Sequence, residues 1–262
     1  MLKGTQGQNM LDRLGVQRII NGQHWRTLLG GSIMLPEVLD AMVESADTFL
    51  NLTELHRKAG EYIAEVSGAD MGLVTAGSTG AQLLQAAACM TGTDDAKVSQ
   101  LPDTKGMKNE ILIGGPQANH YDGAFRLAGA KVIEIGTQID TTPDELADAI
   151  NKNTAAIAYT WVMRWNGLSL DQVIEIAHDH DVPVILDAAS ELPPADNLTK
   201  FIRMGVDMVA FSGGKGLRGP QSTGILIGRR DLMEAAYLNA FSFNRPKANV
   251  GRPMKIAKEE IV

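Results

Sequence analysis

Seven short runs of apolar, β-forming residues recur along this chain, and they constrain its fold more than any other feature. Several runs are apolar nearly throughout, which is typical of strands covered on both faces. Helical patterns fill most of the intervals, so we predict an α/β fold with a mostly parallel seven-stranded sheet and helices on both faces. The predicted strands cover residues 71–76, 110–115, 131–136, 155–161, 182–189, 207–213 and 224–229.

The intervals between the strands show the spacing of apolar residues that amphipathic helices require. In one of them, Thr53 is placed to cap the start of a helix and Gly68 to end it. The interval between strands 207–213 and 224–229 is too short for a crossover helix, so one of these two strands is expected to be antiparallel. The predicted helices cover residues 36–50, 53–68, 79–90, 143–151 and 170–181.

The bulk composition bounds the classes of function. The 262 residues are 44% hydrophobic, which is enough for one sizeable core, and the net charge of −7 argues against a surface built for nucleic acid. Cys89 is the single cysteine, which excludes an internal disulfide and a cysteine-rich metal site and fits a reducing, cytoplasmic setting. We expect no signal peptide, because the N-terminal stretch MLKGTQGQNMLDRLG has no apolar core. We also expect no membrane span, because no run of about 18 apolar residues is present.

Lys215 follows strand 207–213 in the stretch FSGGKGLRGPQ. An ammonium group near a protein interior is costly without a partner. The neighbouring glycines remove side chains and permit unusual backbone angles, so the loop can hold the lysine close to a planar ligand. A desolvated lysine amine is a nucleophile toward aldehydes, whereas a solvated loop lysine is the commoner alternative.

Asp187 lies near the end of the apolar strand 182–189, where it requires a cationic or hydrogen-bonding partner. A protonated pyridine nitrogen would serve, and the ion pair would keep that ring an electron sink. A helix cap or a structural hydrogen bond is the alternative.

Gly77, Ser78 and Thr79 open a predicted helix directly after strand 71–76. The free N–H groups and the positive dipole end of a helix favour an anion, and the two hydroxyls add donors, which indicates a phosphate site. Ser212 is a further candidate donor. Serine and threonine also cap many helices for structural reasons alone.

His120 and Tyr121 follow strand 110–115. Either ring could stack on a flat ligand, from the side opposite the strand that carries Asp187. A capping histidine and a packed tyrosine are the alternatives.

One ligand accounts for these features together. The lysine could react with an aldehyde, the aspartate could pair with a pyridinium, and the helix start could bind a phosphate. These are the three groups of pyridoxal 5′-phosphate (PLP). The stretches INGQHWRTLLGGS, YDGAFRLAGAKVIEIG and FSGGKGLRGPQSTGILIG occur in the order expected of a fold-type I PLP enzyme. The chain resembles the selenocysteine synthase-like family, which includes L-seryl-tRNA(Sec) selenium transferase and D-glucosaminate-6-phosphate ammonia-lyase, and Ser-Gly-x-Lys-x-x-x-Gly-Pro-Gln is the most specific part of the resemblance.

The resemblance implies two catalytic residues: Lys215 as the lysine that forms a Schiff base with PLP, and Asp187 as the partner of the pyridine nitrogen. It also implies that the active site lies at a subunit interface, as is usual for the fold. Together the motifs and the resemblance give the expected cofactor-binding residues, which are Gly77, Ser78, Thr79, His120, Asp187, Ser212 and Lys215.

The expected function is that of a PLP-dependent lyase. It would remove the α-proton of a hydroxylated or phosphorylated amino acid and complete a β-elimination, as D-glucosaminate-6-phosphate ammonia-lyase does. The alternatives are an L-seryl-tRNA(Sec) selenium transferase, an aminotransferase, or a truncated PLP-binding protein without full activity. The expected partners are a small-molecule amino acid and further copies of the chain, in a homodimer or a larger homo-oligomer, and no nucleic acid or membrane.

Three segments are expected along the chain: an N-terminal segment at 1–50, a PLP-binding large domain at 51–240, and the start of an incomplete C-terminal small domain at 241–262. The last segment reads as a linker followed by a short amphipathic start, which cannot bury its own apolar face.

Overall fold

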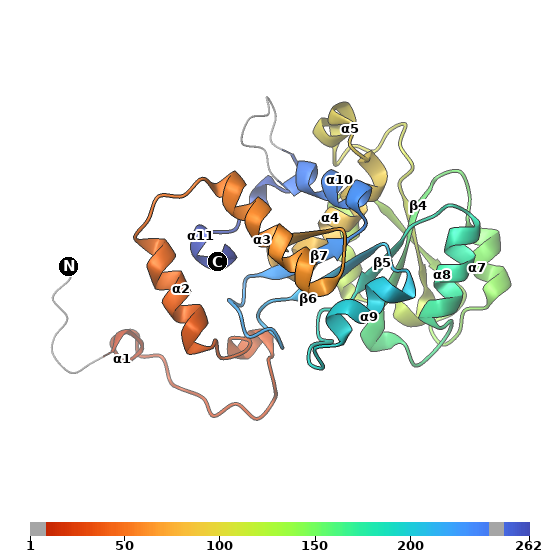
Figure 1. Ribbon diagram of the computed structural model, residues 1–262. Coiled ribbons are helices and arrows are strands. Elements are labelled where there is room, and N and C mark those ends of the chain that lie inside the picture. Colours follow the sequence, from red (N-terminus) through yellow and green to blue (C-terminus); the bar gives the residue numbers. More distant parts are fainter. Residues whose placement is uncertain (1–8, 241–248) are drawn as a thin grey trace.

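A seven-stranded sheet forms the centre of the computed structural model, which describes residues 9–240 and 249–262 (Figure 1). All seven predicted strands are present, and their ends differ from the predicted ends by at most two residues. The strands are β1 (Met71–Thr75), β2 (Glu110–Gly114), β3 (Lys131–Ile135), β4 (Thr154–Thr160), β5 (Val184–Asp187), β6 (Met208–Ser212) and β7 (Gly224–Gly228).

The order of the strands is β1-β7-β6-β5-β4-β2-β3, and every neighbouring pair is parallel except those that involve β7. β7 is antiparallel to β6 on one side and to β1 on the other, and Gly224 pairs with both Ser212 and Thr75. The expected antiparallel strand is therefore confirmed as β7. Because β1 and β6 both oppose β7, they run in the same direction as each other.

Helices cover both faces of the sheet, as predicted. All five expected helices are present, but the predicted cap at Thr53 was wrong, because the side chain of Asn51 accepts the backbone N–H groups of Thr53 and Glu54. Gly68 ends that helix with a φ of 69°, as expected. The helices are α1 (Met10–Leu14), α2 (Pro36–Ala46), α3 (Leu52–Ser67), α4 (Gly77–Thr91), α5 (Asp95–Gln100), α6 (Gly123–Leu127), α7 (Pro143–Ala149), α8 (Leu170–Asp179), α9 (Asn197–Met204), α10 (Arg230–Ala240) and α11 (Lys258–Ile261).

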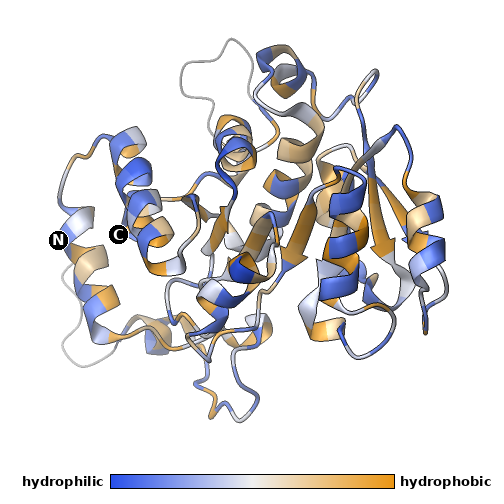
Figure 2. Cartoon of the chain, turned by 45° about the vertical axis from the view of Figure 1, so that its right-hand side comes forward, coloured by the Kyte–Doolittle hydropathy of each residue, from blue (hydrophilic) through white to orange (hydrophobic). Residues whose placement is uncertain are grey.

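The core lies in two layers, because successive side chains of a strand point to opposite faces. In β2, Ile111 and Ile113 pack beneath α4, α6 and α10, whereas Leu112 packs beneath α7 and α8 on the other face. Figure 2 shows the strands as largely apolar, whereas most of the helices carry both apolar and polar residues. The sheet is thus buried on both faces. Polar side chains can therefore meet a ligand at the ends of the strands.

The last helix of the described chain, α11, lies beside helices from its N-terminal part (Figure 1). α11 packs against α2 and α3. The expectation that the C-terminal segment cannot bury its apolar face was wrong for Ile256 and Ile261, which are buried with Val74 in a small cluster of their own. Residues 241–248 of that segment and 1–8 of the N-terminal segment lie outside the described residues, and the division into three segments stays a prediction.

None of the helices in the described parts of the chain has the length and apolar character needed to cross a membrane.

Candidate active site

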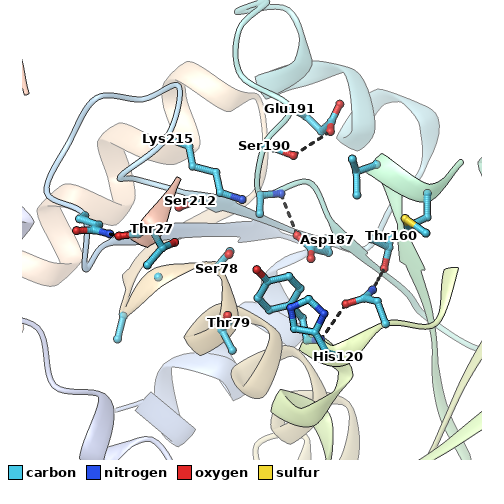
Figure 3. A pocket seen from close by; sticks show the side chains of 18 of the residues that line it. Thr27, Ser78, Thr79, His120, Thr160, Asp187, Ser190, Glu191, Ser212 and Lys215 are labelled. Atoms are coloured by element: carbon cyan, nitrogen blue, oxygen red, sulfur yellow. Dashed lines mark hydrogen bonds between the residues drawn. The ribbon is translucent and has the colours of Figure 1, made fainter. Parts of the chain in front are cut away.

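A cavity of about 560 Å³ opens where the carboxyl ends of the parallel strands meet. This edge is where open parallel sheets usually hold their ligands. All seven site residues predicted from the sequence line this one cavity (Figure 3). They come from different strand ends, and they are Gly77, Ser78, Thr79, His120, Asp187, Ser212 and Lys215.

Asp187 ends strand β5, and both oxygens of its carboxylate are held by hydrogen bonds. The backbone N–H of Ala189 donates to Oδ1 at 2.9 Å, and Nε2 of Gln82 donates to Oδ2 at 2.7 Å. Burial raises the pKa of Asp187, against the opposing effects of Ala189, Lys215 and Gln82. A carboxylate in this position strongly favours a cationic partner in the cavity.

Lys215 follows β6 on a tightly packed loop, and Figure 3 shows its side chain reaching into the cavity. Arg218 adopts a left-handed φ of 57° in this loop, whereas the glycines at 213, 214, 216 and 219, which could adopt such angles, all lie outside the left-handed region. Close approach explains two of them instead. A Cβ on Gly216 would lie 1.7 Å from the backbone oxygen of Leu192, and one on Gly214 would lie 2.4 Å from Cα of Gln221. The loop that carries the lysine is therefore fixed by backbone contacts.

The start of helix α4 faces the cavity and has no side-chain cap. Gly77 adopts a φ of 69°, a conformation that disfavours other residues, and it turns the chain from β1 into the helix. No acidic residue lies in the first turn, and the hydroxyls of Ser78 and Thr79 line the cavity. Uncapped N–H groups at the positive end of a fifteen-residue helix suit an anion such as a phosphate.

His120 lies on the other side of the cavity from Lys215 (Figure 3). It belongs to a short 3-10 helix, His120–Asp122, that is capped by Asn119, so the alternative of a capping histidine is wrong. The rings of His120 and Tyr121 are 4.0 Å apart between centroids and tilted by 39°. Both rings line the cavity, which leaves either one able to contact a flat ligand.

Several polar residues of the site were not predicted. Gln82 bonds to Asp187, Asn119 donates from Nδ2 to the hydroxyl of Thr160 at 3.2 Å, and Glu191 lines the cavity beside Ser190. A signal existed for Gln82, because a glutamine inside the apolar stretch AQLLQAAA must find a buried partner. The other contacts join distant segments, and no local pattern indicates them.

A second hollow of about 370 Å³ adjoins the cavity and shares Thr27, Tyr121 and Lys215 with it. Its outer wall is the segment from Gln23 to Leu28, which includes His24 and Arg26. The side chain of Gln221 donates to the backbone oxygen of Thr27 at 2.8 Å, which ties this segment to the chain near Lys215.

Comparison with known proteins identifies relatives of this chain. The Aminotransferase class-V family matches residues 117–244. A 5'-C-glycyluridine monooxygenase-decarboxylase of Streptomyces sp is 32% identical, in a match that covers 95% of this chain and 62% of that protein. A D-glucosaminate-6-phosphate ammonia lyase of Salmonella typhimurium is 31% identical, over 97% of this chain and 68% of that protein. An L-seryl-tRNA(Sec) selenium transferase of Mannheimia succiniciproducens is 29% identical, over 60% of this chain and 37% of that protein.

The fold is also found in solved structures. A structure of D-glucosaminate-6-phosphate ammonia-lyase matches with a TM-score of 0.88 and 30% identity, over 97% of this chain and 68% of that one. A SepCysS–SepCysE N-terminal domain complex matches with a TM-score of 0.63 and 17% identity, which shows the fold alone. The chain spans less than two thirds of the length of the glycyluridine enzyme and little more than two thirds of the lyase.

Proposed function

Since the chain belongs to the selenocysteine synthase-like family of fold-type I PLP-dependent enzymes, we propose that it binds PLP and acts as a lyase on a hydroxylated or phosphorylated amino acid. The meeting of Lys215 and Asp187 in one cavity is the observation that carries the proposal. The net reaction would convert a β-hydroxy amino acid into a keto acid and ammonia. One water is lost in the elimination, and another is consumed in the hydrolysis that releases ammonia.

The cavity fits PLP by the chemistry of its donor set. Lys215 would hold the aldehyde carbon through Nζ, and the carboxylate of Asp187 would keep the ring nitrogen protonated. The uncapped start of α4, with Ser78 and Thr79, would hold the phosphate, and Ser212 would add a donor. Either His120 or Tyr121 would lie against the ring.

The chain's own groups would then move the protons. PLP, when bound, supplies an electron sink for the charge that develops on the α-carbon of the substrate. Nζ of Lys215, once free, would take the α-proton, and Asp187 would stay ionised throughout. The tight loop around Lys215 would limit where Nζ can reach, which favours one face of the substrate.

The adjoining hollow supports a substrate that extends beyond the reacting carbon. Arg26 and His24 line it, and none of its lining side chains from the described residues is acidic. Nη1 of Arg26 donates to Oε1 of Gln23 at 3.1 Å, which orients the guanidinium at the rim. A phosphate or carboxylate at the far end of the substrate would find its counter-charge there.

Trapping the cofactor tests the proposal directly. The protein is mixed with PLP, reduced with borohydride, digested and analysed by mass spectrometry. We expect the added mass on the peptide that carries Lys215, its loss in Lys215→Ala, and its retention in Lys200→Ala, whose lysine is absent from the cavity lining. No added mass on that peptide in the unmodified chain would overturn the proposal.

The activity is tested with D-glucosaminate 6-phosphate and related hydroxy amino acids. We expect ammonia and a keto acid in equal amounts, and no release from Lys215→Ala. If PLP is trapped on Lys215 and none of these substrates is turned over, the binding half of the proposal stands and the lyase half fails.

Transfer of selenium on seryl-tRNA is the weaker candidate. Six L-seryl-tRNA(Sec) selenium transferases match 56–85% of this chain at 26–30% identity, against 97% at 31% for the lyase of Salmonella typhimurium. The net charge of −7 also opposes the binding of a polyanion. Retention of seryl-tRNA in a gel-shift assay at physiological salt would reverse this ranking.

We also propose a cytoplasmic homodimer or larger homo-oligomer. The single cysteine, Cys89, supports a reducing compartment. α1 has no buried residue and α2 buries only Ser45, so the N-terminal helices leave apolar side chains uncovered in a single chain.

A further inference from the structure

We propose that Gln82 is a positioning residue for Asp187, which holds the carboxylate turned toward the cavity and favours its ionised form. The inference rests on the proposed function for its purpose, since an ionised Asp187 is what a protonated ring nitrogen requires. Its physical content concerns only residues of this chain.

The geometry fixes the carboxylate at both ends. Gln82 is 2% exposed, and its Nε2 lies 2.7 Å from Oδ2 of Asp187, whereas the backbone N–H of Ala189 lies 2.9 Å from Oδ1. A carboxylate held at both oxygens cannot rotate about its terminal torsion without losing a bond. Each oxygen still keeps a further lone-pair position for a ligand in the cavity.

Gln82 is itself held firmly. Its neighbours Ala81 and Leu83 are buried, and Nε2 of Gln85, one turn further along α4, donates to the backbone oxygens of Leu186 and Met208 at 3.3 and 3.1 Å. These bonds fasten α4 to β5 and β6. Eleven residues of α4 are buried, so packing on the sheet holds this helix in place even without those bonds, and the amide of Gln82 is presented to Asp187 from a fixed position.

The electrostatics of the site give the bond its importance. Burial raises the pKa of Asp187, and the nearby carboxyl of Asp122 raises it further, while Ala189, Lys215 and Gln82 lower it. A hydrogen bond donated to a carboxylate favours the ionised form. Removal of the Gln82 donor takes away one of the contacts that lower the pKa of Asp187. The effect of burial then raises this pKa further and favours the protonated carboxyl.

Two matched variants of one helix separate positioning from support of the fold. Gln82→Met and Gln85→Met each remove a buried amide from α4, but only the first removes a donor to Asp187. The carboxyl carbons of aspartate are labelled with ¹³C, the Asp187 signal is assigned through Asp187→Asn, and its titration is followed by NMR without cofactor. We expect a higher pKa of Asp187 in Gln82→Met and an unchanged pKa in Gln85→Met.

A titration of Asp187 that is the same in folded Gln82→Met as in the unmodified chain would overturn the inference. Gln82→Glu is the second variant, in case the first does not fold. It keeps the size of the side chain but offers no amide donor, and its negative charge should raise the pKa of Asp187 further. An unchanged titration in this variant overturns the inference equally.

The affinity for PLP adds a second measurement. We expect Gln82→Met to weaken equilibrium binding of PLP about tenfold, because the free-energy contribution of a hydrogen bond to a charged group corresponds to about a tenfold change in the dissociation constant. We expect Gln85→Met to leave the affinity for PLP nearly unchanged. If the unmodified chain does not bind PLP, the proposed function fails while the titration still decides this inference. If PLP binds and the titration does not move, this inference alone fails.

Discussion

A buried carboxylate such as Asp187 has consequences for the stability of the fold as well as for catalysis. Burial raises its pKa above that of an exposed aspartate. A group whose pKa is raised on folding stabilises the fold at low pH, and this contribution is lost as the pH rises through the folded-state pKa. The protein without cofactor should therefore lose stability through Asp187 between acidic and neutral pH.

The substitution Asp187→Asn tests whether burial of the ionised carboxylate lowers the stability of the fold. We expect the variant without cofactor to unfold at a higher temperature than the unmodified chain at neutral pH, because an amide has no charge to desolvate. The difference should shrink toward mildly acidic pH, where the carboxyl is protonated too. Scanning calorimetry of the two proteins across this pH range makes the comparison.

A control for this prediction is Asp148→Asn, on the exposed side of α7. Its melting temperature should stay close to that of the unmodified chain at each pH. A lower melting temperature for Asp187→Asn at neutral pH would show that the hydrogen bonds to the carboxylate outweigh the cost of burying its charge.

Single residues with distinctive chemistry could be predicted from the sequence. Lys215 follows one apolar strand and Asp187 ends another, and topology brings such strand ends together. Gln82 could not be assigned in the same way, because it is 105 positions away from Asp187 and their contact depends on how α4 lies across β5. The pairing of Asn119 with Thr160 is another tertiary contact without a local signal.

At the scale of elements, the loop after β6 is held by contact between backbones. Gly216 approaches the backbone oxygen of Leu192 so closely that no side chain fits, whereas a Cβ on Gly219 would meet its nearest atom, the backbone oxygen of Gly213, at 3.5 Å. The two glycines of one loop therefore differ in what they tolerate.

Gly216→Ala should displace the loop and with it Lys215. We expect a loss of about a hundredfold in turnover, since a misplacement of about 1 Å in a reacting group costs that much. The borohydride trapping of PLP should fall in parallel. Gly219→Ala is the matched control and should retain most of the turnover and most of the trapping of PLP. Equal losses in Gly216→Ala and Gly219→Ala would contradict this account of the loop.

The strands were predictable because apolar runs of strand length are conspicuous. Among the described residues, five helices had no predicted counterpart: α1, α5, α6, α9 and α10. The last helix, α11, was expected only as a short amphipathic start. α9, for example, buries only Phe201 and follows two consecutive prolines, so its pattern is weak in the sequence. The conformation of the glycine loop was also beyond prediction, since the close approach of Leu192 is a tertiary contact.

At the scale of the whole molecule, apolar side chains cluster on the N-terminal segment. Ile33 is 80% exposed, Val43 73% and Phe49 104%. Burial of such surface stabilises by about 25 cal/mol for each Å², which makes a second copy of the chain a favourable cover. The same segment forms the outer wall of the hollow beside Lys215, so assembly would act on the site as well.

We therefore expect light scattering on a sizing column to give at least twice the mass of one chain. The double variant Ile33→Asp and Val43→Asp should lower that mass, because two charges would be buried at the contact. Leu127→Asp, which changes an exposed leucine on α6, should not. A single-chain mass for the unmodified protein would refute the assembly.

The reversed strand β7 separates β1 from β6, and neighbouring strands lie about 4.8 Å apart. The start of α4 after β1 and the lysine loop after β6 are thus held roughly 10 Å apart by the backbone alone. The sheet therefore sets the length of a ligand that can bind at both sites. A compound that contacts the start of α4 and Lys215 together must span this distance, whereas a shorter aldehyde or an isolated phosphate can bind at only one of the two.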